Sequence, residues 1–242
     1  MPAARLIDDV SSTSSAAEHM VADEALLDAI ATGAPPALRV YTWCRPALSL
    51  GRFQPGSDVD RAACSRHGVE VVRRPSGGRA LLHGADVTYA IALTRPPEPV
   101  LATYRLLARA LVAGLARLDV NAVVTEHRER AGAACFGALA GADLRVGERK
   151  LCGSAQVRRG TAVLQHGAIL LRRLAFDESD LVVGTERGEL RAGTVTLEEL
   201  GARHEPGAVA TALVEGFATA LDLDFTSRAP LPLVSSGRSL RG

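Results

Sequence analysis

The sequence is poor in the features that mark several large classes of protein. Aromatic residues make up only 4% of the 242 residues, with a single Trp, which argues against the stacking surfaces that bind single-stranded nucleic acid. The formal net charge is +1, so no overall field attracts nucleic acid or a membrane surface. No stretch reaches the roughly 18 uncharged apolar residues of a membrane span. We therefore expect neither a nucleic-acid nor a membrane partner.

The cysteine pattern also lacks a recognisable framework. None of the four cysteines forms a C-x-x-C pair, so we expect no metal site. The N-terminal stretch lacks the apolar core of a signal peptide, which favours a cytoplasmic protein with free thiols. The four residues are Cys44, Cys64, Cys135 and Cys152.

The apolar periodicity predicts an α+β fold in which hairpins outnumber β-α-β crossovers, and therefore mixed, mostly antiparallel sheets flanked by helices. We expect a mobile N-terminus over residues 1–15, one domain over 16–226 and a disordered tail over 227–242. Helices are predicted over 16–33, 57–68, 101–118 and 207–222. Strands are predicted over 37–43, 47–53, 69–74, 79–84, 86–94 and 121–127, followed by a three-stranded meander over 142–171 with turns at Gly147 and Gly160.

The first chemically informative stretch is "RRPSGGRALLH", residues 73–83. Its two glycines allow backbone N–H groups to approach a ligand closely, and a turn of this kind forms an anion-binding nest. Arg73, Arg74 and Arg79 add positive charge suited to a phosphate or carboxylate. The alternative interpretation is a plain hairpin turn with solvated arginines.

A second stretch, "GERKLCGSAQ", places Lys150 at the start of a predicted strand. The small residues Gly153, Ser154 and Ala155 follow it, and small residues on a strand indicate that a ligand or another backbone comes close. A lysine in such a cleft carries positive charge to an acyl carbonyl, a phosphate or a thiolate. The alternative is an ordinary solvated lysine.

Two cysteines are candidate nucleophiles. Cys135 lies in the irregular stretch "GAACFG", and loops on a rigid scaffold often carry catalytic groups. A nearby lysine ammonium lowers the pKa of a thiol and so favours the reactive thiolate. Cys152 is the rival, because on a strand it shares a face with Lys150. His83 and His166 are candidate acid–base or substrate-orienting groups, or else buried structural histidines.

Four motifs in order resemble those of the lipoate-protein ligase and octanoyltransferase superfamily, which shares its fold with the biotin-protein ligases. The resemblance covers roughly residues 16–222. The motifs are "MVADEALL", "LSLGRFQ", "RRPSGGRALLHGADVTYAI" and "GERKLCGSAQVRRGTAVLQHGAILL". The domain over 16–226 is accordingly expected to be a catalytic domain of this superfamily.

The resemblance implies a set of site residues. Lys150 corresponds to the lysine beside the carboxyl end of the acyl chain, and Cys135 to the nucleophile of one octanoyltransferase branch. These two are the expected catalytic residues, and no metal ligand is expected. The expected substrate-binding residues are Arg74, Ser76, Gly77, Gly78, His83, Gly153, Ser154, Ala155, Gln156, His166 and Gly167.

The resemblance also implies a reaction. An octanoyltransferase takes octanoate from octanoyl-acyl carrier protein, holds it as a cysteine thioester and passes it to a lysine of a lipoyl-domain protein, without a cofactor. The acceptor is expected to be a protein such as the glycine cleavage H protein or the E2 subunit of a 2-oxoacid dehydrogenase. The alternatives are an ATP- and magnesium-dependent lipoate- or octanoate-protein ligase, a lipoyl or octanoyl amidotransferase, and a non-catalytic acyl-binding module.

Overall fold

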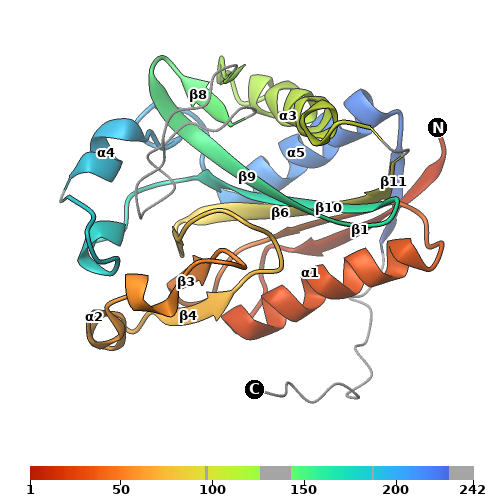
Figure 1. Cartoon of the computed structure of the whole chain (residues 1–242). Coiled ribbons are helices and arrows are strands. Elements are labelled where there is room, and N and C mark those ends of the chain that lie inside the picture. The colour runs from red at the N-terminus through yellow and green to blue at the C-terminus, as the bar shows by residue number, and fades with distance from the viewer. Residues whose placement is uncertain (96–97, 126–142, 187, 229–242) are drawn as a thin grey trace.

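The computed structural model describes residues 1–95, 98–125, 143–186 and 188–228 (Figure 1). Its strands are β1 (Ala3–Asp9), β2 (Ala37–Tyr41), β3 (Ala47–Leu50), β4 (Glu70–Arg73), β5 (Leu81–His83), β6 (Asp86–Thr94), β7 (Val123–Val124), β8 (Leu144–Val146), β9 (Arg149–Arg159), β10 (Ala162–Leu170) and β11 (Asp224–Arg228). Its α-helices are α1 (Ala16–Ala31), α2 (Arg61–Arg66), α3 (Val100–Ala116), α4 (Glu189–Gly193) and α5 (Pro206–Leu221). Two 3₁₀ turns, η1 and η2, cover Gly56–Asp58 and Glu178–Asp180.

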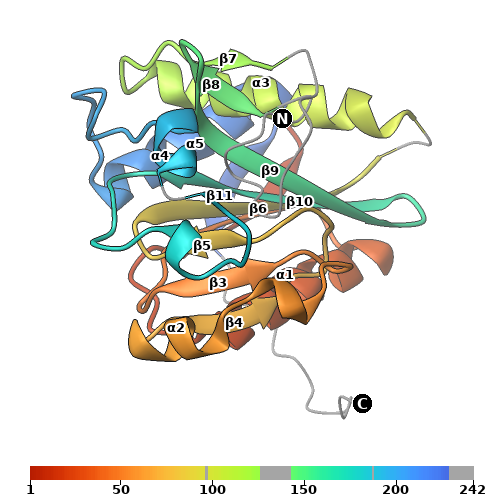
Figure 2. The same cartoon turned by 60° about the vertical axis from the view of Figure 1, so that its left-hand side comes forward.

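The strands form a large and a small sheet. The large sheet has eight strands in the order β11-β1-β2-β6-β10-β9-β8-β7, and the small one has three in the order β4-β3-β5. Helices α3 and α5 cover one face of the large sheet, whereas α1 and the small sheet lie on the other (Figures 1 and 2). The pairings are mostly antiparallel, with parallel pairs at β1–β2, β1–β11 and β3–β4, so the predicted α+β class is confirmed.

The predicted meander is confirmed, and its strands β9 and β10 carry the motif over residues 147–171. Strands β8, β9 and β10 pair antiparallel in sequence order, with turns at Gly147 and Gly160. The predicted helix faces are also buried: Leu107, Leu111 and Leu115 of α3 are fully covered. Period 2 in the strands and period 3.6 in the helices were therefore sufficient to find these elements.

The expectation of a mobile N-terminus over 1–15 is corrected. Residues 3–9 form β1, an interior strand that pairs in parallel with β2 on one side and β11 on the other. Backbone pairing to both neighbours holds this strand, with Ala4 and Ile7 deeply buried and Leu6 and Val10 packed against the core. At the other end, β11 includes residues 227 and 228 of the expected tail, and 229–242 lie outside the described residues.

Helices α3 and α5 approach each other closely through two glycines. A Cβ atom added at Gly216 would lie 2.4 Å from the carbonyl oxygen of Ala110 and 2.5 Å from the backbone nitrogen of Gly114. A Cβ atom at Gly114 would lie 2.8 Å from the carbonyl oxygen of Ala212. Because backbone atoms of both helices are in contact there, any side chain would push the helices apart.

We therefore predict that Gly216→Ala lowers the free energy of unfolding by about 1–3 kcal/mol, as overpacking typically does. In a chain of this size each kcal/mol lowers Tm by roughly 2–4 °C. Gly207→Ala in the first turn of α5 is the matched control, since its Cβ would meet no atom within 4 Å. Thermal melts of both variants check this, and equal melting temperatures would contradict the close packing.

Candidate functional site

The Ser-Gly-Gly loop, residues 75–79 between β4 and β5, is braced from within by two arginines. The buried Arg74 guanidinium donates hydrogen bonds to the carbonyl oxygens of Ser49, Gly77 and Arg79. Arg73 donates to the carbonyl oxygens of residues 51, 52 and 54, which form the neighbouring loop after β3. These arginines, expected to surround an anion, are instead largely committed to holding two loops together.

The hydroxyl of Ser76 is held by a buried histidine–carboxylate pair. His166 on β10 lies with Nε2 2.6 Å from Ser76 Oγ and Nδ1 2.8 Å from Asp23 Oδ2. Asp23, on α1, also accepts hydrogen bonds from Arg39 and Tyr41 of β2. When His166 is neutral and donates Nδ1–H to Asp23, its Nε2 accepts from the Ser76 hydroxyl, which gives the donor–acceptor order of a Ser–His–Asp triad.

A second histidine–carboxylate pair lies beneath the same loop. His83 has Nε2 3.0 Å from Ser49 Oγ and Nδ1 3.0 Å from Asp86 Oδ2, and its ring stacks on Trp43 at 4.1 Å between centroids. Ser49 Oγ also accepts from Arg74 at 3.1 Å, so this pair and the Arg74 brace form one network. His83 and His166 are thus both buried and both oriented by carboxylates. This arrangement suits a catalytic histidine and a structural histidine equally well.

The glycines of the loop leave backbone donors unused. Gly78 adopts a left-handed backbone with φ of 93°, and a Cβ there would lie 2.7 Å from Arg74 Nη2. A Cβ at Gly77 would meet open space. Within the described part of the chain, neither N–H donates a hydrogen bond. Two adjacent N–H groups beside open space can bind a developing oxyanion or a phosphate oxygen.

Lys150 is buried rather than solvated, with 2% of its surface exposed. Its Nζ lies 2.8 Å from Asp143 Oδ2, and Asp143 also accepts from the backbone N–H of Ser154. The backbone of Lys150 is fixed on both sides, by Arg145 of β8 and by a bridge to Thr194. A buried ammonium requires such a partner, because an unpaired charge in the interior is very costly.

The small residues of β9 divide between the two faces of the sheet. Ala155 pairs directly with His166, and Gly153 with Ala168, on the face toward α1. The Ser154 hydroxyl instead lies 2.8 Å from the hydroxyl of Tyr89, on the face covered by α3 and α5.

Gln156 belongs to the same opposite-face group as Ser154. It binds Gln165, which in turn donates to the Tyr89 hydroxyl. Gly167, paired with Ser154, leaves room for that tyrosine, since a Cβ there would lie 2.8 Å from a Tyr89 ring carbon. Ser154, Gln156 and Gly167 therefore belong to the face of the sheet that α3 and α5 cover, while Ala155 and His166 face the network at Ser76.

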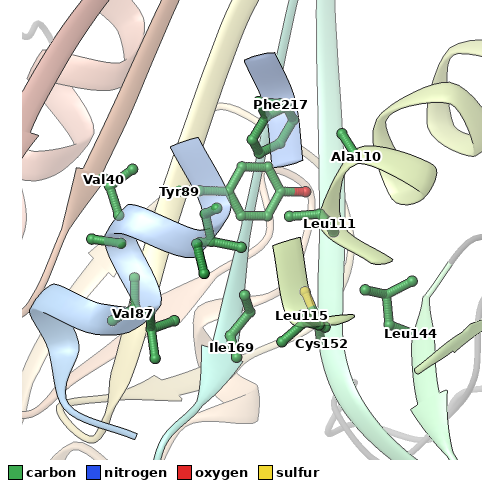
Figure 3. Packing of buried hydrophobic residues seen from close by; sticks show 14 of the residues in the cluster. Val40, Val87, Tyr89, Ala110, Leu111, Leu115, Leu144, Cys152, Ile169 and Phe217 are labelled. Carbon is green, nitrogen blue, oxygen red and sulfur yellow. The ribbon is translucent and has the colours of Figure 1, made fainter. Parts of the chain in front are cut away.

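Cys152 is an ordinary core residue. Figure 3 shows it packed near Leu115, Leu144 and Ile169, and it is fully buried. Burial raises the pKa of its thiol to about 12, with a further contribution from the Asp143 carboxylate that outweighs Lys150. Such a thiol is protonated at neutral pH and is a poor nucleophile. Cys135 lies outside the described residues.

Sequence reasoning missed the carboxylates that orient the site. Asp86 lies within the motif of residues 73–91, Asp143 lies four residues before the motif that begins at Gly147, and Asp23 lies one turn from Met20 and Leu27 within the apolar stripe of α1. A charged residue on the buried face of an amphipathic helix needs a buried partner, so this position was the available signal.

Comparisons with known proteins identify the family of the chain. The family described as the lipoyl protein ligase A/B catalytic domain matches residues 15–218, and the chain belongs to it. An octanoyltransferase LipM of Kyrpidia tusciae is 40% identical over 86% of this chain and 84% of its own. One of Carboxydothermus hydrogenoformans is 46% identical over 65% of this chain, which spans 62% of that relative's length.

Solved structures share the fold. A bipartite lipoate protein ligase of Thermoplasma acidophilum, studied with its E2 lipoyl domain, has a TM-score of 0.79 at 23% identity over 94% of this chain and 87% of its own. A T. acidophilum ligase structure with bound lipoic acid has a TM-score of 0.77 at 22% identity, covering 93% of this chain and 88% of that one. Among the described residues no helix is long and apolar enough to cross a membrane.

The two faces of the sheet allow a matched test with serine variants. Ser76→Ala and Ser154→Ala each remove one hydroxyl from a buried hydrogen bond, so we predict that each lowers the free energy of unfolding by about 1–3 kcal/mol. Only Ser76→Ala should slow modification of a lipoyl-domain acceptor, by roughly 10- to 100-fold, because it frees the loop that carries the backbone donors. Melting curves and mass spectrometry of the acceptor check this. Equal rates of acceptor modification in the two variants would show that Ser76 has no role in the reaction.

Proposed function

We propose that the protein is an octanoyl-[acyl carrier protein]:protein N-octanoyltransferase that works through a thioester on Cys135. The observation that carries the proposal is the buried Lys150–Asp143 pair, which directly follows the chain segment containing Cys135. Relatives named octanoyltransferase, at 36–40% identity over 86% of the chain, support the same reaction. The buried, protonated Cys152 thiol leaves Cys135 as the favoured nucleophile.

In the first step the Cys135 thiolate attacks the carbonyl carbon of the octanoyl thioester on acyl carrier protein. A new C–S bond forms, the bond to the carrier sulfur breaks, and the carrier leaves as its thiolate. Lys150 is the positive charge proposed to favour both thiolates. The N–H groups of Gly77 and Gly78 are the proposed donors to the oxyanion of the tetrahedral intermediate.

In the second step the neutral ε-amine of a lipoyl-domain lysine attacks the Cys135 thioester. The C–N bond forms, the Cys135 thiolate leaves, and the amine loses a proton to give an amide. The donor is already activated as a thioester, so the proposed reaction uses neither ATP nor a metal ion. The proposed acceptors are proteins such as the glycine cleavage H protein or a 2-oxoacid dehydrogenase E2 subunit, and the proposed setting is the cytoplasm.

The second candidate is an ATP-dependent lipoate- or octanoate-protein ligase. One observation favours it: unused adjacent N–H groups at Gly77 and Gly78 suit a phosphate oxygen as well as an oxyanion. This enzyme would make an acyl adenylate with magnesium-ATP and would need no cysteine. A lipoyl or octanoyl amidotransferase would use the same cysteine with a lipoyl-domain donor.

Intact-protein mass spectrometry after mixing with octanoyl-acyl carrier protein, without ATP, tests the proposal. Wild type and Cys152→Ala are expected to gain one octanoyl group that hydroxylamine removes, because a thioester is labile to it. Cys135→Ala is expected to gain none. Acceptor modification should proceed without ATP in wild type and should be lost in Cys135→Ala.

The other outcomes separate the alternatives. An adduct that persists in Cys135→Ala but is lost in Cys152→Ala would show that the nucleophile is the buried Cys152. No adduct, with the acceptor modified only when magnesium-ATP and free octanoate are added, would identify a ligase. An adduct formed from an octanoylated lipoyl domain and not from the carrier protein would identify an amidotransferase.

A further inference from the structure

A cavity of about 80 Å³ lies between β5, the start of β6 and the segment that follows β10. Two exposed arginines, Arg172 and Arg191, line it, so the cavity reaches the surface. Its walls are otherwise mainly apolar. The apolar side chains are Leu81, Leu82, Leu170, Leu174, Phe176 and Leu190.

Glu178, in the 3₁₀ turn η2, places a buried carboxyl group in this wall. The residue is 6% exposed, and its Oε2 accepts a hydrogen bond from the backbone N–H of Leu82 at 3.1 Å. Its Oε1 is buried and has no hydrogen-bond partner among the described residues. Burial raises the pKa of Glu178 to about 8, and the Leu82 N–H only partly offsets this. At neutral pH the group is therefore mostly a neutral acid with an O–H to donate.

Other charged groups around the cavity are already paired. Arg173 binds Glu199 and Thr194, and Asp86 binds His83. The titratable and charged groups that face the cavity or act on Glu178 from the surrounding elements are Asp177, Arg172, Arg191, Arg173, Asp86, Arg74 and Lys150. The unsatisfied carboxyl oxygen of Glu178 is thus the polar atom in the described wall that calls for a ligand.

This chemistry discriminates among possible occupants. A saturated acyl chain offers no acceptor, and burying an unsatisfied O–H against it would cost about 1–3 kcal/mol. A lysine ammonium would have to bring its charge into a largely apolar wall, which is costly even where the carboxyl ionises to pair with it. A slender chain with amide carbonyls supplies both the acceptor and apolar stretches for the leucine walls.

We propose that the cavity is a subsite for the acyl donor's thiol arm, in which the Glu178 carboxyl donates a hydrogen bond to an amide carbonyl. The inference rests on the proposed carrier-protein donor, because such a carrier presents its thioester on a pantetheine arm with two amides and a phosphate. Arg172 offers positive charge for that phosphate, beside Arg191, which forms an ion pair with Asp177 at 3.6 Å. The cavity also adjoins the candidate site through Thr194, which is bridged to Lys150, and through Asp86, which orients His83.

Calorimetric titration of the full chain with free 4′-phosphopantetheine tests this subsite, independently of octanoyl transfer. Glu178→Gln is the conservative variant, since its carbonyl can accept from Leu82 and its NH₂ can donate into the cavity; Glu178→Leu removes both functions. We expect Kd to stay within about twofold in Glu178→Gln and to rise about tenfold in Glu178→Leu. Pantetheine without the phosphate should bind more weakly to all three proteins. Melting curves control for folding.

The pH dependence of Kd for 4′-phosphopantetheine is a second test. The carboxyl O–H is present below pH 8 and lost above it, so Kd for wild type should rise between pH 7 and 9, while Glu178→Gln should show no such change. Equal Kd values for wild type and a folded Glu178→Leu would overturn the subsite, as would absence of binding by wild type at millimolar ligand. If octanoyl-enzyme forms in wild type while these Kd values do not differ, the subsite proposal fails and the transferase proposal stands. If 4′-phosphopantetheine binds as expected and no octanoyl-enzyme forms, the transferase proposal fails and the subsite proposal stands.

Discussion

The fully buried carboxylate of Asp23 is the interaction around which the candidate site is organised. Burial alone would raise the pKa of Asp23, but the hydrogen bond and charge of His166, with those of Arg39, outweigh burial and hold the carboxyl below its usual value. One charged group thereby ties α1 to β2 and β10. A buried charge with several partners fixes the positions of those partners, because losing any of them leaves a costly unpaired group. The placement of α1 and the orientation of His166 follow from it.

The second histidine–carboxylate pair, His83 and Asp86, likewise fixes side chains beside the loop. Asp86 orients His83, and His83 and Arg74 both bind the Ser49 hydroxyl. Arg74 in turn donates to the carbonyl oxygens of Gly77 and Arg79 in the Ser-Gly-Gly loop. Among the described residues these side chains are thus committed to each other, and the backbone N–H groups of Gly77 and Gly78 have no acceptor there. Donors fixed in advance stabilise developing charge without reorganising during the reaction, which is a large part of what an enzyme site supplies.

The sequence was informative where a single local rule decides the structure. Periodicity located α3, α5 and the β8–β10 meander, and the order of the motifs identified the family. It failed where the deciding contact is remote. Strand β1 is held by backbone pairing to β11, more than 200 residues away, which no side-chain pattern in residues 3–9 reveals.

Alternation of side chains along β9 limits the acyl-pocket prediction in a different way. A run of small residues indicates close approach on both faces of a strand, and the run itself does not say which face meets the ligand. Ser154 turns toward Tyr89 behind the sheet, whereas Ala155 faces His166. Only the register with β10 separates these roles, and register depends on the assembled sheet.

The charges at the site also bear on the type of substrate. In the part of the chain that the structure describes, the buried ionic groups are matched within the protein: Lys150 with Asp143, and Asp23 with Arg39. The remaining buried donors discussed above are neutral, at the glycine backbone and at the Glu178 carboxyl, while Arg172 and Arg191 carry positive charge at the surface. A neutral thioester can enter such a site without displacing an ion pair, whereas an anionic adenylate would need additional positive charge or a metal ion to replace its hydration. The internal pairing of charge therefore favours thioester exchange over adenylate chemistry on the same fold.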